Sequence, residues 1–133
     1  MAKLRHIAMV VEEMEKTAQF YEKAFEMKRV RQSATAIGLS DGVVSLVIIH
    51  PSNINMKGDD RRGLHHLGFL VEDVNRESER VMSAGAKLHG AIIDSTSGTE
   101  GRTEREHKFK DPNGQIFDLT TPGYARDVWQ IAV

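Results

Sequence analysis

The sequence predicts an α+β protein in which two βαβββ modules form one curved, eight-stranded mixed sheet around a central cavity. The first observation is an internal repeat, because "HIAMVVEEM" at 6–14 matches "HLGFLVEDV" at 66–74, an offset close to half of the 133 residues. The second is that each copy leads into a helical pattern and then into three strand-like stretches. A chain of this length suits one domain, or two small modules that share a core.

The first module is expected at 1–50. After the strand that holds the repeat, Met14, Ala18, Tyr21 and Phe25 recur at three- and four-residue steps, which is typical of a helix with one buried face. Three strands are expected to follow, and "SDG" at 40–42 marks the turn before the last of them. The expected strand ranges are 28–31, 34–39 and 43–50.

The second module, with a C-terminal tail, is expected at 64–133, after a polar linker at 51–63. Val74, Val81 and Met82 indicate its helix, which is expected to stop at Gly85 because glycine readily adopts the backbone conformation that ends a helix. "DPNG" at 111–114 marks the turn that matches "SDG". The expected strand ranges are 87–93, 104–110 and 115–120, and the loop at 95–103 is a candidate to cover a site.

Charge and composition exclude several classes of function. The chain has 18 basic and 19 acidic residues, so no field of one sign favours nucleic acid or an anionic membrane as a partner. It has no cysteine, which excludes disulfides, thiolate metal sites and a cysteine nucleophile. No run approaches the about 20 apolar residues of a membrane span, and the first apolar run is too short for a signal peptide. We therefore expect a cytoplasmic protein.

Two histidines occupy equivalent places in the repeat. Because strand side chains alternate between two faces, His6 and Ala8 share one face, as do His66 and Gly68. A lone histidine on a strand is most often structural, but repetition at an inward position favours a functional role. The small residue two positions later leaves volume beside each ring. His65 is expected to point to the opposite face and only to pack there.

Asp118 lies in an apolar strand, where a carboxylate is costly unless it is paired or binds a metal. Matching "VVSLV" at 43–47 to "IFDLT" at 116–120 pairs Asp118 with Ser45. Modules related by pseudo-symmetry would bring His6, His66 and Asp118 together, with Ser45 at a fourth position. Two imidazoles and one carboxylate with open positions suit a divalent ion such as Fe, Mn, Ni, Zn or Co. The alternative for Asp118 is a hydrogen bond to a turn or an ion pair with an arginine.

Two further residues are candidates for catalysis. Glu106 and Lys108 share one face of the strand expected at 104–110. A carboxylate and an ammonium group at neighbouring positions can transfer a proton or anchor a substrate. We therefore expect both side chains to face the site.

The stretches "HIAMVVEEMEKTAQFYEKAFEM", "GLHHLGFLVEDV" and "DPNGQIFDL" resemble the vicinal oxygen chelate superfamily. This superfamily includes glyoxalase I, methylmalonyl-CoA epimerase, extradiol dioxygenases, and fosfomycin- and bleomycin-resistance proteins. The resemblance covers nearly the whole chain and implies metal positions at His6, Ser45, His66 and Asp118. Ser45 departs from the four-ligand pattern of glyoxalases and epimerases, whereas three ligands match the extradiol and fosfomycin types. Asp118 replaces the usual Glu, and Lys108 stands where the extradiol pattern has Tyr.

The resemblance implies two candidate functions. One is a metal-dependent enzyme, of the dioxygenase type or of the glyoxalase type (a lyase or isomerase), acting on a small substrate that chelates the ion through oxygen. The other is a metal-free protein that binds a metabolite or an antibiotic, as bleomycin-resistance proteins do. A homodimer is expected because such half-barrels expose sheet edges and apolar faces. The modules can pair within one chain or across two.

Overall fold

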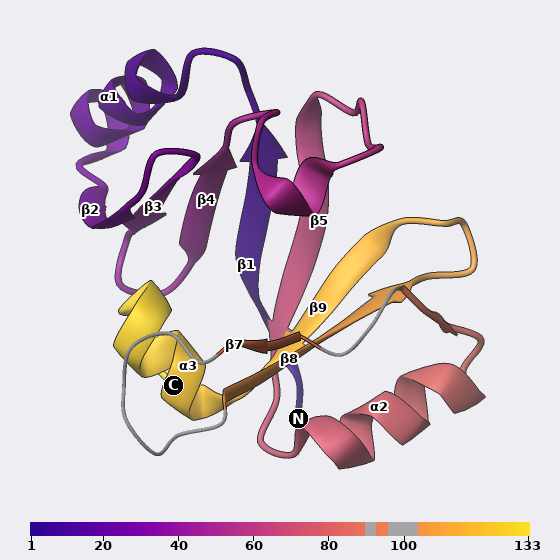
Figure 1. Ribbon diagram of the computed structural model, residues 1–133. Helices are drawn as coiled ribbons and strands as arrows, with labels where there is room; N and C mark the ends of the chain where they lie inside the picture. Colours follow the sequence, from indigo (N-terminus) through magenta and orange to yellow (C-terminus); the bar gives the residue numbers. More distant parts are fainter. Residues whose placement is uncertain (90–92, 96–103) are drawn as a thin grey trace.

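The strands form one mixed sheet in the computed structural model, which describes residues 1–89, 93–95 and 104–133, without the side chains of 93–95 and 104–106. The path β2-β3-β4-β1-β5-β9-β8-β6 takes four strands from each half, and the short β7 also pairs with β8 (Figure 1). The predicted α+β class, with two repeated halves in one sheet, is confirmed. The strands are β1 (Lys3–Val10), β2 (Lys28–Gln32), β3 (Ala36–Ser40), β4 (Ser45–Ile49), β5 (Gly63–Leu70), β6 (Lys87–Leu88), β7 (Ile93–Ser95), β8 (Glu104–Lys110) and β9 (Ile116–Thr120).

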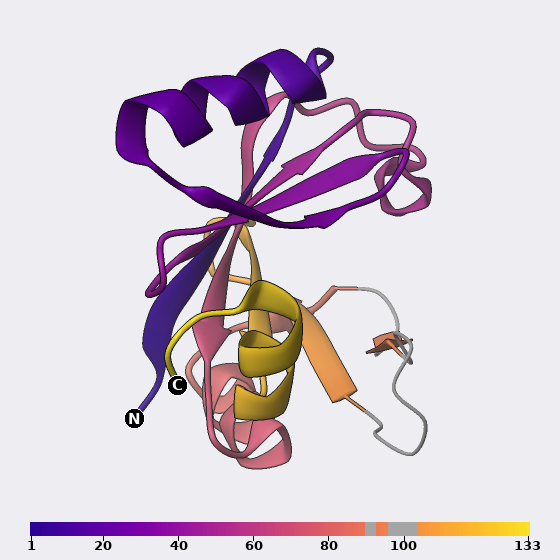
Figure 2. The same cartoon turned by 90° about the vertical axis from the view of Figure 1, so that its left-hand side faces the viewer.

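One helix from each half packs on the same face of the sheet. α1 (Met14–Phe25) buries Ala18 against β3 and β4, and α2 (Val74–Ser83) buries Val74 against β8 and β9. Figures 1 and 2 show the two helices at opposite ends of the molecule. The expected apolar faces are only partly buried, because Phe25 is 64% exposed and Met82 is 51% exposed. No helix among the described residues is long and apolar enough to cross a membrane.

The C-terminal segment lies against the other face of the sheet. It consists of α3 (Pro122–Tyr124) and a single π-helical turn, η2 (Ala125–Trp129). Its end is held by the first half, because Ser40 Oγ donates to the Gln130 carbonyl at 3.0 Å and the Ala132 amide donates to the Gly42 carbonyl at 2.8 Å. The segment therefore follows the last strand of the second half and binds the first half.

The two halves meet where β1 and β5 pair antiparallel, within one chain. The register shifts twice along this pair. One additional residue, Arg5, lies on β1 just before His6, and one additional residue, His65, lies on β5 just before His66. Such a bulge leaves a residue outside the ladder and re-aims its side chain. Both histidines of the repeat thus follow a bulge in the central strand pair.

The connecting segments differ from expectation in two places. The strand expected at 87–93 ends at Leu88, and a separate strand begins at Ile93. The loop expected at 95–103 lies, apart from Ser95, outside the described residues. The segment at 51–63 contains a 3₁₀ turn, η1 (Ile54–Met56). The module boundaries at 1–50, 51–63 and 64–133 stay predictions.

Candidate metal centre

Three buried side chains from the central strands converge on one point. His6 of β1, His66 of β5 and Asp118 of β9 are 4%, 8% and 0% exposed. One ligand atom from each lies within 4.8 Å of the other two. The three residues share the face of the sheet opposite the helices, as strand alternation predicts. The sequence-predicted residues are therefore brought together by β1, β5 and β9.

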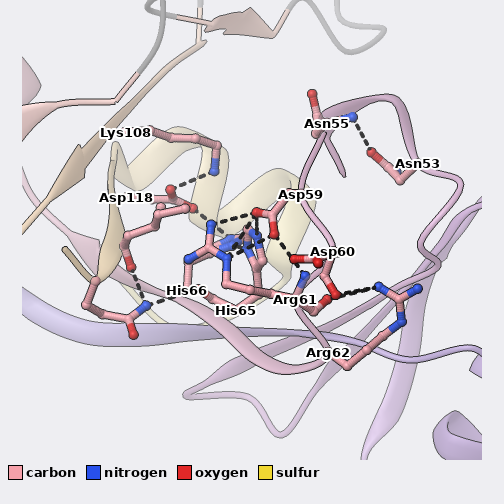
Figure 3. Close-up of polar contacts among 12 residues, drawn as sticks. Asn53, Asn55, Asp59, Asp60, Arg61, Arg62, His65, His66, Lys108 and Asp118 are labelled. Carbon is pink, nitrogen blue, oxygen red and sulfur yellow. Dashed lines mark hydrogen bonds and ion pairs between the residues drawn. The ribbon is translucent and has the colours of Figure 1, made fainter. Parts of the chain in front are cut away.

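The Asp118 carboxylate has one oxygen in an ion pair and one without a hydrogen bond. Oδ1 lies 2.7 Å from Lys108 Nζ (Figure 3). Oδ2 lies 3.1 Å from His66 Nε2, but the contact lacks hydrogen-bond geometry and this buried oxygen has no other hydrogen-bond partner among the described residues. Leaving a buried carboxylate oxygen unsatisfied is costly. A cation between Oδ2 and the two imidazoles would satisfy it, so the residues present fit a divalent ion.

Of the two candidate catalytic residues, Glu106 and Lys108, the structure describes the side chain of Lys108 alone. Lys108 pairs with Asp118 in the β8–β9 register and reaches its carboxylate. Glu106 pairs with Thr120 in the same ladder, two residues from Lys108 on the same strand face. The Glu106 side chain lies outside the described residues.

Ser45, Trp129 and Gly68 are among the described residues that restrict the position of His6. Its Nδ1 lies 3.0 Å from Ser45 Oγ. The indole of Trp129 stacks on the imidazole, with ring centroids 4.3 Å apart and planes at 8°. A Cβ on Gly68, its partner in the β1–β5 register, would lie 2.6 Å from His6 Cβ. The volume expected beside His66 is therefore taken by the ring of His6, so Gly68 is needed for close approach of the two strands.

The prediction that Ser45 is the counterpart of Asp118 is wrong. In the parallel ladders, Asp118 pairs with Gly68 and Val47 pairs with Ala8, so Val47 holds the equivalent place. Ser45 instead pairs with His6. Val43 and Val44 belong to the turn at 41–44, and β4 begins only at Ser45, whereas β9 begins directly at Ile116. Matching Val43 to Ile116 therefore shifts the alignment by two residues. The fourth position is apolar.

The prediction that His65 only packs on the opposite face is also wrong. His65 is 8% exposed, and its Nδ1 lies 2.7 Å from His66 Nδ1. Its Nε2 lies 2.8 Å from Asp59 Oδ2 (Figure 3). Strict alternation fails here because His65 is the additional residue of the bulge. Gln115 Nε2 donates to the His65 carbonyl at 3.0 Å and so holds the bulge in place.

Asp59 extends the site into the segment that was expected to be only a linker. Arg61 Nη2 lies 2.6 Å from Asp59 Oδ2. Hydrogen bonds from Arg61, and secondarily from His65, hold the pKa of Asp59 well below its ordinary value, so the group is a carboxylate. The sequence carried one signal of this contact, an acidic residue six positions before the double histidine, but nothing in the pattern places that loop against β5.

Comparisons with known proteins agree on the fold. The family model for the Glyoxalase/Bleomycin resistance protein/Dioxygenase superfamily matches residues 3–119. No curated protein matches the chain in sequence.

Solved structures of similar fold share little sequence with the chain. A hypothetical protein from Bacillus halodurans C-125 has a TM-score of 0.70 at 14% identity, covering 90% of this chain and 94% of its own. Methylmalonyl-CoA epimerase from Mycobacterium tuberculosis has a TM-score of 0.68 at 18% identity, covering 90% and 87%. A Streptomyces coelicolor methylmalonyl-CoA epimerase variant in complex with 2-nitronate-propionyl-CoA has a TM-score of 0.66 at 17% identity, covering 90% and 93%. At this identity the likeness is one of fold.

Proposed function

The chain belongs to the Glyoxalase/Bleomycin resistance protein/Dioxygenase superfamily, and on that premise we propose that it is a divalent-metal-dependent enzyme acting on a small oxygen-chelating substrate. One observation carries the proposal: the ligand atoms of His6, His66 and Asp118 lie within 4.8 Å of one another, all three residues are buried, and Asp118 Oδ2 has no hydrogen-bond partner among the described residues. Two imidazoles and one carboxylate suit Fe(II), Mn, Ni, Zn or Co.

The remaining neighbours favour a site with open coordination positions. Val47 has no donor atom at the place equivalent to Asp118, and Ser45 Oγ is engaged with His6. Three protein donors leave room for two oxygen atoms of a substrate. A divalent ion bound there would supply Lewis-acid polarisation of a substrate oxygen.

Lys108 and Glu106 are the proposed catalytic residues. The Lys108 ammonium group, next to Asp118, places a positive charge where it can bind an anionic substrate oxygen. Glu106, two positions earlier on the same strand face, is the proposed proton acceptor. A proton transfer beside a chelated carbonyl (glyoxalase type) and an oxygenation of a chelated substrate (dioxygenase type) both suit this set. The substrates of the epimerases are not carried over, because the likeness to them is one of fold.

Metal analysis of the purified protein tests the proposal. The protein is produced with Fe, Mn, Ni, Zn and Co supplied separately, and bound metal is measured by elemental analysis. We expect close to one ion per chain in the wild type and loss of the ion in His66→Ala. His50→Ala is the control, because His50 forms a hydrogen bond with Ser52 and is not one of the three proposed metal ligands. No bound metal under any supplement would refute the metal-dependent function, and full retention in His66→Ala would refute the ligand set.

A second candidate function is metal-free binding of a small metabolite or antibiotic. The observation that favours it is the 2.7 Å ion pair between Lys108 and Asp118, because this pair compensates the buried carboxylate without an ion. Lys108→Met separates the two functions. A metal-binding site gains affinity for a divalent ion when the competing cation is removed, whereas a metal-free site loses stability and no ion restores it. The homodimer and the cytoplasmic location stay predictions, and light scattering tests the first.

A further inference from the structure

We infer that Asp59 and His65 are positioning residues that fix the proton of His66 on Nδ1, so that Nε2, beside Asp118, is the nitrogen that can ligate a metal. This inference deepens the proposed function and rests on it for its biological meaning. It concerns two residues outside the predicted ligand set, one on the segment at 51–63 and one at the bulge of β5.

The carboxylate of Asp59 determines which nitrogen donates in each of the two contacts, Asp59–His65 and His65–His66. A carboxylate only accepts hydrogen bonds, so the 2.8 Å contact with Asp59 Oδ2 places a proton on His65 Nε2. A neutral imidazole carries one proton, and His65 Nδ1 is therefore an acceptor. The 2.7 Å contact between the two Nδ1 atoms then requires that His66 Nδ1 donates.

The other ring nitrogen of His66 lies beside the carboxylate of Asp118, with Nε2 3.1 Å from Oδ2. A proton on Nδ1 leaves the lone pair of Nε2 available to a cation at this point. Partners that fix the tautomer of a ligating histidine typically change metal affinity by about 10- to 100-fold when they are mutated.

The bulge and Arg61 hold the two positioning residues in place. On a regular strand His65 would point away from His66, but as the additional residue of the bulge it lies beside it, with ring centroids 5.0 Å apart. Arg61 binds both oxygens of Asp59 through Nε, at 3.0 and 3.2 Å. The carboxylate is thereby held against His65 rather than turned to solvent.

Long-range ¹H–¹⁵N NMR of the metal-free full chain tests the inference without any ion. The His66 resonances are assigned by their loss in His66→Gln. In the wild type we expect the proton on Nδ1. In Asp59→Asn, whose amide can donate or accept, we expect both tautomers. Asp60→Asn is the control, because the described residues show a hydrogen bond to His65 from Asp59 and none from Asp60. Calorimetry with Co²⁺ is expected to give a Kd raised about tenfold or more in Asp59→Asn and unchanged in Asp60→Asn.

A wild-type His66 protonated on Nε2 would overturn the inference, as would an Asp59→Asn protein with the wild-type tautomer. Circular dichroism checks that Asp59→Asn is folded, and the wild-type measurement needs no variant. A wild type with the expected tautomer and no affinity for any divalent ion would support the inference about the proton and refute the proposed function. Failure of the inference about the His66 proton and failure of the proposed metal-dependent function therefore give different results.

Discussion

The half of the sheet that begins with β1 and the half that begins with β5 place a histidine by the same backbone arrangement and surround it with different side chains. In each half a bulge residue precedes the histidine, Arg5 in one and His65 in the other. In each half the last strand offers one side chain at the equivalent register, Val47 in one and Asp118 in the other.

The two halves share a backbone arrangement but differ in the side chains that surround the histidine. The first half supplies one ligand, His6, which contacts the Ser45 hydroxyl of the same half and the indole of Trp129 from the C-terminal tail. The second half supplies two ligands, His66 and Asp118, and the ammonium group of Lys108. The segment between the halves adds the charge of Asp59 through His65. A hydroxyl can donate or accept, so it does not fix the tautomer of His6, whereas a carboxylate fixes that of His65. Backbone symmetry is kept, and the chemistry lies mainly in one half.

Making the halves alike at the last strand should have the largest effect. Val47→Asp introduces a second carboxylate at the place equivalent to Asp118, on a side chain that is 7% exposed. Without metal we expect the free energy of unfolding to fall by roughly 3 to 5 kcal/mol, because a buried charge is left uncompensated. Added Co²⁺ or Zn²⁺ should recover more stability than in the wild type. Thermal unfolding with and without the ion measures both, with Val47→Thr as the uncharged control. Equal metal-induced shifts in both proteins would mean that Val47 does not face the ion.

The small residues opposite the histidines give the next effect. Gly68→Ala puts a methyl group 2.6 Å from His6 Cβ, and we expect a loss of about 1 to 3 kcal/mol from overpacking. The counterpart change, Ala8→Gly opposite His66, should cost only about 0.5 to 1 kcal/mol, through backbone entropy. Urea unfolding of both variants gives the comparison. Equal losses of stability would show that the contact of Gly68 with His6 is no closer than the contact of Ala8 with His66.

Ser45→Ala should have a smaller effect, confined to the first half. It removes the 3.0 Å contact with His6 Nδ1, at a cost of about 1 kcal/mol. Metal affinity should fall because His6 is less well oriented, while the tautomer of His66 stays as in the wild type. The same NMR and calorimetry measurements apply. A change in the His66 proton would show that the loss of Ser45 is passed on through the ring contact of His6 with His66, whose centroids lie 5.4 Å apart.

The contact of Asp59 should give an effect on stability about as small as that of Ser45→Ala, and one that depends on pH. Because its pKa in the folded chain lies below the ordinary 3.8, its stabilisation is complete above that value and is lost as the pH falls toward the folded-state pKa. Asp59→Asn should lower the free energy of unfolding by about 1 kcal/mol near neutral pH and by less at about pH 2. Urea unfolding at both pH values, with Asp60→Asn beside it, measures this. A deficit that stays the same at low pH would contradict the charged role of Asp59.

Strand alternation was sufficient to place His6, His66 and Asp118 on one face, because the pairing of β1 with β5 is regular between the two bulges and the pairing of β5 with β9 is regular throughout. It failed at His65, which is the additional residue of a bulge. A bulge arises from the pairing of two strands, so the alternation of side chains along one strand does not reveal it. Matching "VVSLV" to "IFDLT" failed at Ser45, since Val43 and Val44 lie in the turn before β4 and the match is shifted by two residues.

Other parts of the site follow from three-dimensional packing. Trp129 reaches His6 from the tail, and Asp59 reaches His65 from the segment between the halves. Neither contact has a periodic pattern in the sequence. The internal repeat therefore predicts the residues at equivalent positions in the two halves, but not the contacts that differ between the halves.

The central claim is that His6, His66 and Asp118 hold one divalent ion. Crystals grown with Co²⁺ or Zn²⁺, measured on both sides of the metal absorption edge, test it most directly. The account predicts one anomalous peak per chain, in contact with His66 Nε2, Asp118 Oδ2 and the imidazole of His6. A map with no peak among these three residues, and Lys108 still paired with Asp118, would contradict it.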